Sequence, residues 1–346
     1  MLYATTRNHV DACTAHSVLI RKRGSDGGLF VPFRLPRFSE QEILALGEKS
    51  FNANAAEILN LLFGSRLCDR DLNLALGQQS VRLRQLGQKI VMGECWHNTD
   101  WQFDRIFRDI TALLLPGEEE KAVRGGWSEV GIRMAVLFGI FGSLIREGLA
   151  GNGKTVDVSL PAGDFSGPMA AWYGRGMGLP IGNIIICCNE NGNLWDFICH
   201  GQLKTDGVAK TTLVPEGDTV VPDGLERLIS AYGGPAEVQR YVEKCRTGST
   251  YYAEDGFLNR LRQGIYVTVS SDRRILDTVP AAWNTHRYLL TPAAALSYAG
   301  LQDYRGRTGS MPTALILEEN SPAGEIDFCA GALGVSRKDL KSYFNV

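Results

Sequence analysis

The sequence predicts an α/β protein with a mostly parallel central sheet and helices on both faces. In the 346-residue chain, apolar segments of strand character alternate with helical segments over most of the second half. The segment 184–188 is a continuous apolar run, which is typical of a parallel strand buried on both faces. Apolar residues make up 44% and charged residues 21%, so a disordered chain, a collagen-like chain and a coiled coil are excluded.

The composition also indicates the cellular location and limits the classes of binding partner. The formal net charge is -2, which does not indicate nucleic acid as a partner. The eight cysteines are scattered without a CxxC pair, so we expect reduced thiols in a cytoplasmic protein rather than disulfides or a zinc knot. The N-terminal residues lack the pattern of a secretory signal. The longest apolar stretch, 134–145, is shorter than the ~20 residues that cross a bilayer, so we expect no membrane partner.

The first half of the chain is predicted to be largely helical. A capping box at Ser39 opens a helix over 40–48. Apolar residues spaced three and four apart predict an amphipathic helix over 102–114. Polar and turn-forming residues then predict a connector over about 115–126, which leads into a buried helix over 127–148.

Strands and helices alternate in the second half. A strand over 156–160 is followed by the glycine-rich turn PAGDFSG at 161–167, a helix that reaches Met177, and the apolar strand 184–188. A strand–helix–strand unit implies two parallel strands joined by a right-handed crossover. The remaining predicted elements are strands at 266–270 and 314–317 and helices at 272–284 and 292–303.

The turn PAGDFSG is the strongest local candidate for a ligand site. It leads from the carboxyl end of a strand into a helix, where free backbone N–H groups and the helix dipole attract an anion. We therefore take Gly163, Phe165, Ser166 and Gly167 as candidate ligand-binding residues. A tight turn without a ligand is the alternative, and the carboxylate of Asp164 counts against an anion because it would repel one.

A second candidate is the polar segment CWHNTDWQFD at 95–104. His97, Asp100 and Asp104 are spaced three and four apart, so on a helix they would share one face. That face could transfer protons or hold a metal ion, although a single histidine makes a metal the weaker alternative. A solvated polar face without a chemical role is the other interpretation.

Motifs spread over most of the chain match one known family in order. The matching stretches are Thr6-Arg7 with 25–32 (family STR … PDGGLYVP), 161–167 (P-[ST]-G-N-F-G), 176–181 with 189–191 (KMGLPI … ATNEN), 212–215 with 225–228 (TLSPSMD … NLERLL), and 271–272 with 288–292 (SDEE … YLLDPHTA). Together they resemble threonine synthase, a pyridoxal phosphate (PLP) enzyme of the tryptophan synthase β type. The resemblance implies the large domain of PLP fold type II and adds Asn189 to the candidate ligand-binding residues.

The resemblance also implies that PLP is not used here. The family's cofactor lysine lies in the motif LFHGPTLAFKD, and alignment on His97 and Phe103 sets Asp104 at the lysine position. A carboxylate cannot form the Schiff base that PLP requires, because that bond needs an amine. The nearest lysines along the chain are Lys89 and Lys121, which do not replace it, so we expect no cofactor.

A second departure from the family is a deletion. In the family a small α/β subdomain with the loop GATSGDTG follows the lysine. Here the segment 127–133, which resembles the INWARIL helix beyond that subdomain, follows within a few turns. We therefore expect an N-terminal extension at 1–93 and an α/β core at 94–346 that lacks the small subdomain.

Polar groups of the family's site are replaced as well. The loop asparagine corresponds to Asp164, the histidine and threonine of PHTA correspond to Ala293 and Ala294, and the final TAHPAKF corresponds to 319–325. Because the lysine, the small-subdomain loop and these polar groups are all changed, the resemblance implies that PLP chemistry is lost.

Three functions remain open. The first is a repurposed, PLP-independent lyase or transferase, in which Asp104, His97, Asp100 and Asp164 converge on one cleft and move protons on a small anionic or amino-acid-derived substrate. The second is a non-catalytic regulatory protein that binds another protein, or itself as a homo-oligomer, through the face that the deletion uncovers. The third, which the departures disfavour, is PLP-dependent threonine synthesis from O-phosphohomoserine.

Overall fold

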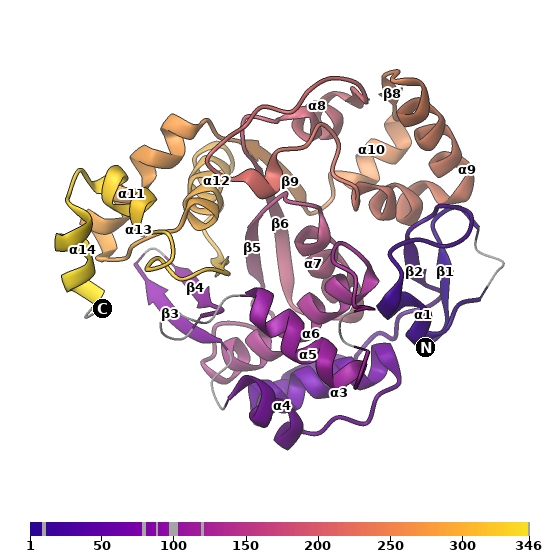
Figure 1. The fold of residues 1–346 in the computed structure, drawn as a ribbon, viewed down its shortest axis with the longest axis horizontal. Coiled ribbons are helices and arrows are strands. Elements are labelled where there is room, and N and C mark those ends of the chain that lie inside the picture. Colours follow the sequence, from indigo (N-terminus) through magenta and orange to yellow (C-terminus); the bar gives the residue numbers. More distant parts are fainter. Residues whose placement is uncertain (9–11, 78–80, 88, 97–102, 119–120, 345–346) are drawn as a thin grey trace.

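A six-stranded, mostly parallel sheet forms the centre of the molecule (Figure 1). The computed structural model describes residues 1–8, 12–77, 81–87, 89–96, 103–118 and 121–344. In spatial order the strands are β3 (Arg82–Leu86), β4 (Ile90–Glu94), β10 (Thr313–Glu318), β5 (Val156–Pro161), β6 (Ile181–Cys188) and β9 (Ile265–Val269). Strands β3 and β4 are antiparallel, and all other neighbours are parallel. The predicted fold class is confirmed.

Helices cover both faces of this sheet. Helices α6 (Trp127–Arg146) and α7 (Ser166–Met177) pack on one face, and α11 (Asp272–His286) and α12 (Pro292–Thr308) on the other. The other helices are α1 (Ala15–Ile20), α2 (Glu40–Ala45), α3 (Phe51–Phe63), α4 (Asp69–Leu76), α5 (Phe103–Leu114), α8 (Asn193–His200), α9 (Leu225–Thr247), α10 (Asp255–Leu261), α13 (Ile326–Leu333) and α14 (Arg337–Phe344). Two short strand pairs complete the fold: β1 (Tyr3–Thr5) with β2 (Phe30–Pro32), and β7 (Gln202–Leu203) with β8 (Tyr251–Tyr252).

The apolar run of β6 has a direct structural reason. Ile184 and Ile186 pack into the core on the side of α7, whereas Ile185 packs into the core on the side of α12. A strand that is covered on both faces needs apolar residues at every position, because successive side chains point to opposite sides. The predicted unit of β5, α7 and β6 is therefore confirmed.

Helix α6 runs through the interior of the molecule. Among the described residues it is the helix long and apolar enough to cross a membrane, but 83% of its most apolar segment is buried, as in a core helix. Helix α3 packs closely along it at Gly139, where an added Cβ would lie 2.5 Å from Phe51 Cδ2. The predicted buried helix over 127–148 is confirmed, with its end at Arg146.

The connector between α5 and α6 positions both helices for the site described below. Residues 115–126 join the two helices, and their described part contains only short turns. Helices α5 and α6 then pack against each other directly.

The expected helix over 40–48 is α2, which ends at Ala45 and continues as a 3-10 turn over Leu46–Glu48. Gly47 lies in that turn against the backbone of Arg146, where a larger residue would not fit.

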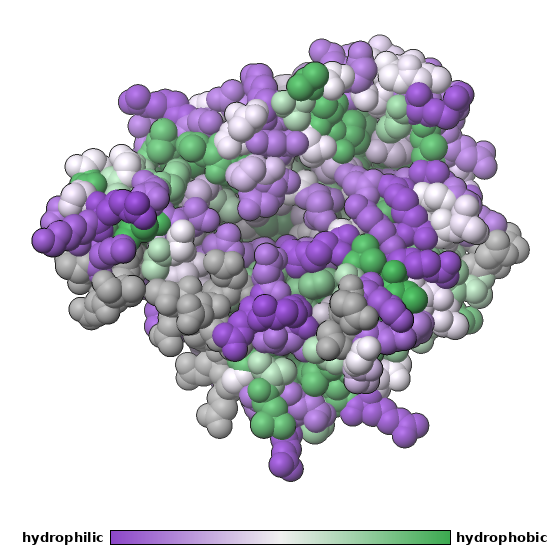
Figure 2. Space-filling model, viewed as in Figure 1, coloured by the Kyte–Doolittle hydropathy of each residue, from purple (hydrophilic) through white to green (hydrophobic). Residues whose placement is uncertain are grey.

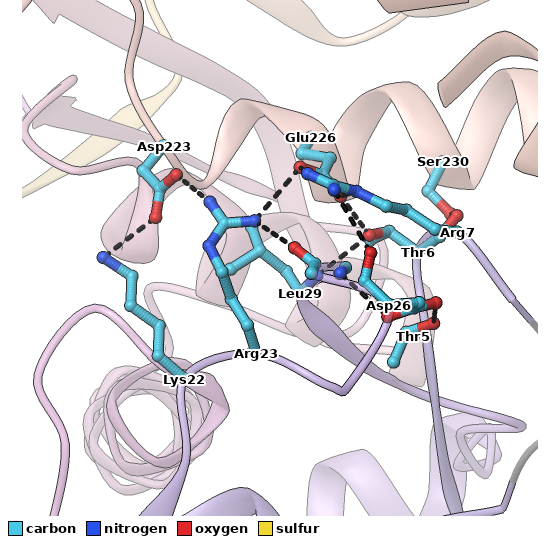
Figure 3. A network of polar contacts seen from close by, with 12 residues as sticks. Thr5, Thr6, Arg7, Lys22, Arg23, Asp26, Leu29, Asp223, Glu226 and Ser230 are labelled. Carbon is cyan, nitrogen blue, oxygen red and sulfur yellow. Dashed lines mark hydrogen bonds and ion pairs between the residues drawn. The ribbon is translucent and has the colours of Figure 1, made fainter. Parts of the chain in front are cut away.

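The N-terminal region is attached to the core in two ways. Strands β3 and β4, which belong to the segment 1–93 that we expected to be an extension, pair into the central sheet. The region before them is fastened by charge, because Arg7 and Arg23 both bind the buried carboxylate of Glu226 at the start of α9 (Figure 3).

This network joins two of the motifs that carry the family resemblance. Arg7 donates to Glu226 through Nε at 3.1 Å and Nη2 at 3.0 Å, and Thr6 Oγ1 donates to the same carboxylate. Lys22 and Arg23 bind the adjacent Asp223, the Lys22 Nζ at 2.8 Å from Oδ2 (Figure 3). The motifs at 6–7 and 225–228 therefore have a structural role in holding the N-terminal region on α9.

Candidate functional site

A cavity of about 400 Å³ lies at the carboxyl ends of β4, β10 and β5. Its wall comes from the residues that follow these strands and from the ends of α5, α6 and α7. The charged and polar lining residues are Asp104, Arg124, Glu129, Arg133, Asp164, Glu216, Thr291, Glu319 and Asn320. The space-filling view shows a hollow near the centre of its face, over β5, β6 and α7, with hydrophilic side chains along its border (Figure 2). In open α/β sheets, ligands bind at this edge.

Arg133 of α6 is the centre of the charged side chains in this cavity. Its Nη2 lies 3.1 Å from Glu319 Oε2 and 3.1 Å from Glu129 Oε1, and Nη1 binds Glu319 Oε1. The guanidinium also lies flat over the Phe103 ring, with Cζ 3.9 Å from the ring centroid. Burial lowers the pKa of Arg133, but the carboxylates of Glu319 and Glu129 outweigh burial and raise it. The guanidinium therefore stays charged and is held in place.

Arg124 of the connector makes the second set of contacts. Its Nη2 lies 2.8 Å from Asp104 Oδ1 and 3.4 Å from Glu129 Oε1. Its Cζ is 4.5 Å from the centre of the Phe107 ring. The side chain of Asp104 remains 76% exposed, so this lining carboxylate is largely open to solvent.

The carboxylate of Asp164 is hydrogen-bonded within the turn at 161–167. Ser166 donates to Asp164 twice, from its backbone N to Oδ1 and from its hydroxyl to Oδ2, each at 2.9 Å. Gly163 and Gly167 line the cavity, whereas Phe165 and Ser166 are buried behind it. Phe165 has a φ of 75°, which is rare for a bulky residue and indicates that surrounding packing imposes the shape of this turn.

The other predicted site residues have different positions. His97 and Asp100 lie outside the described residues, and the described part of the helix begins at Phe103. Asn189 does not line this cavity. Its amide nitrogen donates to Thr212 Oγ1 at 2.8 Å and to Asp218 Oδ1 at 2.8 Å, which ties together the loop after β6. The structure therefore brings Asp104 and Asp164 into one cavity.

Sequence reasoning did not single out Arg124, Glu129 or Arg133 as site residues. A signal was present, since Glu129 and Arg133 are four residues apart inside a helix that is otherwise apolar, and a buried charge is rarely without a partner. Arg124 lies in the connector, where its contacts with Asp104 and Phe107 depend on how α5 folds back. That arrangement could not be obtained from spacing.

A buried acid cluster lies directly behind the cavity. Glu94 and Glu318 are opposite each other at the ends of β4 and β10, and the Tyr288 hydroxyl contacts both carboxyl groups. Arg82 donates to Glu94 at 2.8 Å, and the Thr291 backbone N donates to Glu318 at 3.0 Å. Burial raises the pKa of Glu318 to about 8 despite these hydrogen bonds. One of the two carboxyl groups therefore keeps its proton near neutral pH.

Comparisons with known proteins agree with these features. The family model described as threonine synthase N terminus matches residues 2–78. A threonine synthase from Pseudomonas aeruginosa is 20% identical over an alignment that covers 90% of this chain and 86% of that protein. The chain is therefore similar to threonine synthases and threonine synthase-like proteins, and its residues 2–78 match the N-terminal model of that family. Threonine synthase-like 1 of Pongo abelii is 29% identical over 159 residues, which is 44% of this chain and about a fifth (21%) of that relative's length.

Solved structures give the same fold. The PLP-bound threonine synthase from Brucella melitensis superposes with a TM-score of 0.83 over 97% of this chain and 92% of that chain, at 18% identity. The alignment with the Pseudomonas relative runs over 406 positions, yet 90% of the 346 residues here is about 311. About 95 positions (406 less 311) therefore have no residue of this chain opposite them.

The donor groups of the cavity decide which cofactors it could hold. No lysine is among the lining residues that the structure describes, and no position outside the described ranges is a lysine. The amine of Lys22 lies beside the lining residue Gly125, where an added Cβ would be 2.9 Å from Nζ, and it is bound to Asp223. Among the described residues, no group of three His, Cys, Asp or Glu side chains could hold a metal ion.

Proposed function

We propose that this threonine synthase-like protein is an enzyme that works without PLP and moves protons on a small amino-acid-derived substrate in the cavity around Asp104. The observation that carries the proposal is the position of Asp104. It lines the cavity with an exposed carboxylate, and it is the residue that the family resemblance sets at the lysine position. A reactive carboxylate has thus taken the position of a reactive amine.

The lining residues do not fit PLP. When bound in a threonine synthase, PLP supplies an electron sink through a Schiff base to a lysine. The described lining offers two guanidiniums and several carboxylates for this role, and neither group can form that bond. A lost lysine therefore supports a changed chemistry, and PLP-dependent threonine synthesis from O-phosphohomoserine is the least supported of the three functions.

The proposal includes the loss of the small subdomain. Two observations support it: the connector of 115–126 joins α5 to α6 by short turns, and about 95 aligned positions of the Pseudomonas relative (406 less about 311) have no counterpart here. In this account the connector also supplies Arg124, which contacts Asp104. The shortened segment thus contributes to the cavity wall.

The residues of the cavity have separable roles in this proposal. Asp104 accepts or donates the proton, because its carboxylate lines the cavity, is largely exposed and forms an ion pair with Arg124. Asp164 is the second carboxylate, fixed by Ser166. Arg133, Glu129 and Glu319 hold the wall in one arrangement. His97 and Asp100 remain candidates for the same cleft by the sequence argument. The eight free thiols support a cytoplasmic location.

The test is substrate depletion. The purified protein is incubated with a panel of amino acids and their O-acyl and O-phospho derivatives, and each compound is followed by NMR. We expect one of them to be consumed without added PLP, and we expect the Asp104→Asn protein to lose at least about 100-fold of that rate, as for loss of a general acid or base. The Glu243→Gln variant, an exposed carboxylate of α9, should retain the rate. An equal rate for Asp104→Asn would contradict the proposal.

A non-catalytic role is the second candidate, and one observation favours it. Arg124 and Arg133 are both bound to carboxylates of the same cavity, so neither is free to orient an acidic substrate. A cavity that satisfies its own charges is compatible with a protein that acts through binding. Size-exclusion chromatography, alone and with an intact threonine synthase, distinguishes the two: a stable complex and no substrate depletion would favour the second candidate.

A further inference from the structure

Among the lining residues that the structure describes, no positive side chain is free of a carboxylate partner and available to an anionic ligand. Arg133 donates to Glu319 and Glu129, and Arg124 binds Asp104 and Glu129. Each guanidinium also lies against an aromatic ring, which covers one of its two faces. An incoming phosphate or carboxylate would have to displace a carboxylate that is already in place, and this exchange yields little net binding energy.

The N-termini of α7 and α5 at the cavity are occupied by carboxylates as well. Helix α7 begins under the turn at 161–167, where the N-terminal N–H of Ser166 would attract an anion. That N–H donates to the Oδ1 of Asp164. Helix α5 carries Asp104 in its first turn. At these two helix N-termini the chain therefore supplies its own anion.

The sum of the charges is negative. The described lining contains five carboxylates (Asp104, Glu129, Asp164, Glu216 and Glu319) and two guanidiniums (Arg124 and Arg133). No position outside the described ranges is a lysine or an arginine. Glu216 is exposed and makes no ion pair within the described part of the chain. An anion brought into this space would be repelled, whereas a cation would be attracted.

The remaining wall of the cavity is apolar, and it determines which uncharged part of a ligand fits. The apolar lining residues are Phe103, Val136, Leu137, Leu160, Ala162, Ala170, Val214, Ala293 and Leu317. A volume of about 400 Å³ with such a wall suits a small ligand with an alkyl or aryl part. Carboxylate oxygens at the edge accept hydrogen bonds from an ammonium group, which has three donors and no acceptor.

We infer that this cavity selects a ligand with a primary ammonium group and an apolar body, of neutral or positive net charge, and that it excludes phosphate-bearing and dicarboxylic ligands. The inference rests on the proposed function and narrows its substrate class from amino-acid-derived compounds in general to amines. Glu216 is the carboxylate best placed to receive the ammonium group, since the other four are engaged by Arg124, Arg133 or Ser166.

The test is calorimetric titration of the purified full chain with butylamine, butanol, butyrate and butyl phosphate, which share one alkyl group. We expect butylamine to bind about tenfold more tightly than butanol, and butyrate and butyl phosphate to bind more weakly than butanol. Glu216→Gln should weaken butylamine binding about three- to fivefold and leave butanol unchanged. Asp104→Asn should act in the same direction, and Glu243→Gln should change neither affinity.

Tighter binding of butyrate or butyl phosphate than of butylamine would overturn the inference and leave the proposed enzyme standing, because substrate depletion by Asp104 does not depend on the ligand's charge. Equal butylamine affinity in the wild type and in both lining variants would also overturn it. Failure of all four compounds to bind would overturn it as well. The proposed function fails separately, when Asp104→Asn leaves the depletion rate unchanged.

Discussion

At the scale of single residues, the Glu94, Glu318 and Tyr288 cluster shows how burial controls a proton. Two carboxyl groups lie side by side at the ends of neighbouring strands, and one tyrosine hydroxyl has a single hydrogen to share between them. Arg82 contacts Glu94 and not Glu318, so the proton stays with Glu318. The cluster adjoins Thr291 and Glu319, which line the cavity, so its charge state bears on the cavity wall.

The cluster predicts a pH dependence of stability. Burial raises the pKa of Glu318 from the ordinary glutamate value of 4.5 to about 8. The unfolded chain thus releases this proton first, and the free energy of unfolding falls as pH rises from about 4.5 to about 8. In Glu318→Gln the fall should be shallower, by up to about 1.4 kcal/mol per pH unit. Denaturant unfolding of both proteins across this range measures the difference.

The matched control for that measurement is Glu243→Gln, whose carboxylate lies on the surface of α9 and pairs with Arg246. It should follow the wild-type profile. Parallel profiles for wild type and Glu318→Gln would mean that Glu318 releases its proton at ordinary pH in the folded protein, and the buried-acid interpretation would be wrong.

At the scale of elements, periodicity predicted the parts that local pattern determines. The helices over 102–114, 127–148, 272–284 and 292–303 and the strands of the β5–α7–β6 unit are all present. The β3–β4 hairpin was not predicted. Strand β3 exposes much of its length and has charged residues at Arg82 and Arg84, so it lacks the apolar alternation of a sheet strand. Its place at the edge of the sheet explains why that composition is tolerated.

The attachment of the N-terminal region to α9 gives an element-scale prediction. Glu226 is buried and receives Arg7, Arg23 and Thr6, so its removal leaves Arg7 without its carboxylate partner and takes away one of the two carboxylates that bind Arg23. Glu226→Leu should lower the free energy of unfolding by about 3 kcal/mol. It should also speed proteolysis of residues 2–78, which match the threonine synthase N terminus.

Urea unfolding and timed trypsin digestion with mass spectrometry measure both effects. Glu243→Gln lies on the same helix away from the network and should match the wild type. An unchanged unfolding free energy for Glu226→Leu would contradict the role of this network in fixing the N-terminal region.

At the scale of the whole molecule, part of the site could be predicted from the sequence. Asp104 and Asp164 are far apart in the chain, and only the family resemblance indicated that they meet; the structure has both lining one cavity. Phe165, Ser166 and Asn189 were expected to touch a ligand, but their side chains are engaged in packing or in holding loops. Glycines and amides in motifs serve local geometry as often as binding, and the sequence alone does not separate the two.

The guanidiniums were missed for a related reason. Arg124 and Arg133 can be recognised as site residues only from the folded arrangement of α5, the connector and α6, because each contacts residues from a different element. Their carboxylate partners leave the cavity with a negative balance. That balance, rather than any one motif, is the basis for our proposal that the cavity does not hold a phosphorylated cofactor.

The central claim is that this cavity works without PLP, and borohydride trapping tests it most directly. The purified protein is incubated with PLP, reduced with borohydride, digested and examined by mass spectrometry, beside the Brucella melitensis threonine synthase, whose structure contains PLP, as a positive control. We predict no visible absorbance band and no stoichiometric phosphopyridoxyl group on any lysine of this chain. A stoichiometric label on one lysine, with Lys22 as the amine to inspect first because it lies beside Gly125 at the cavity, would contradict the account.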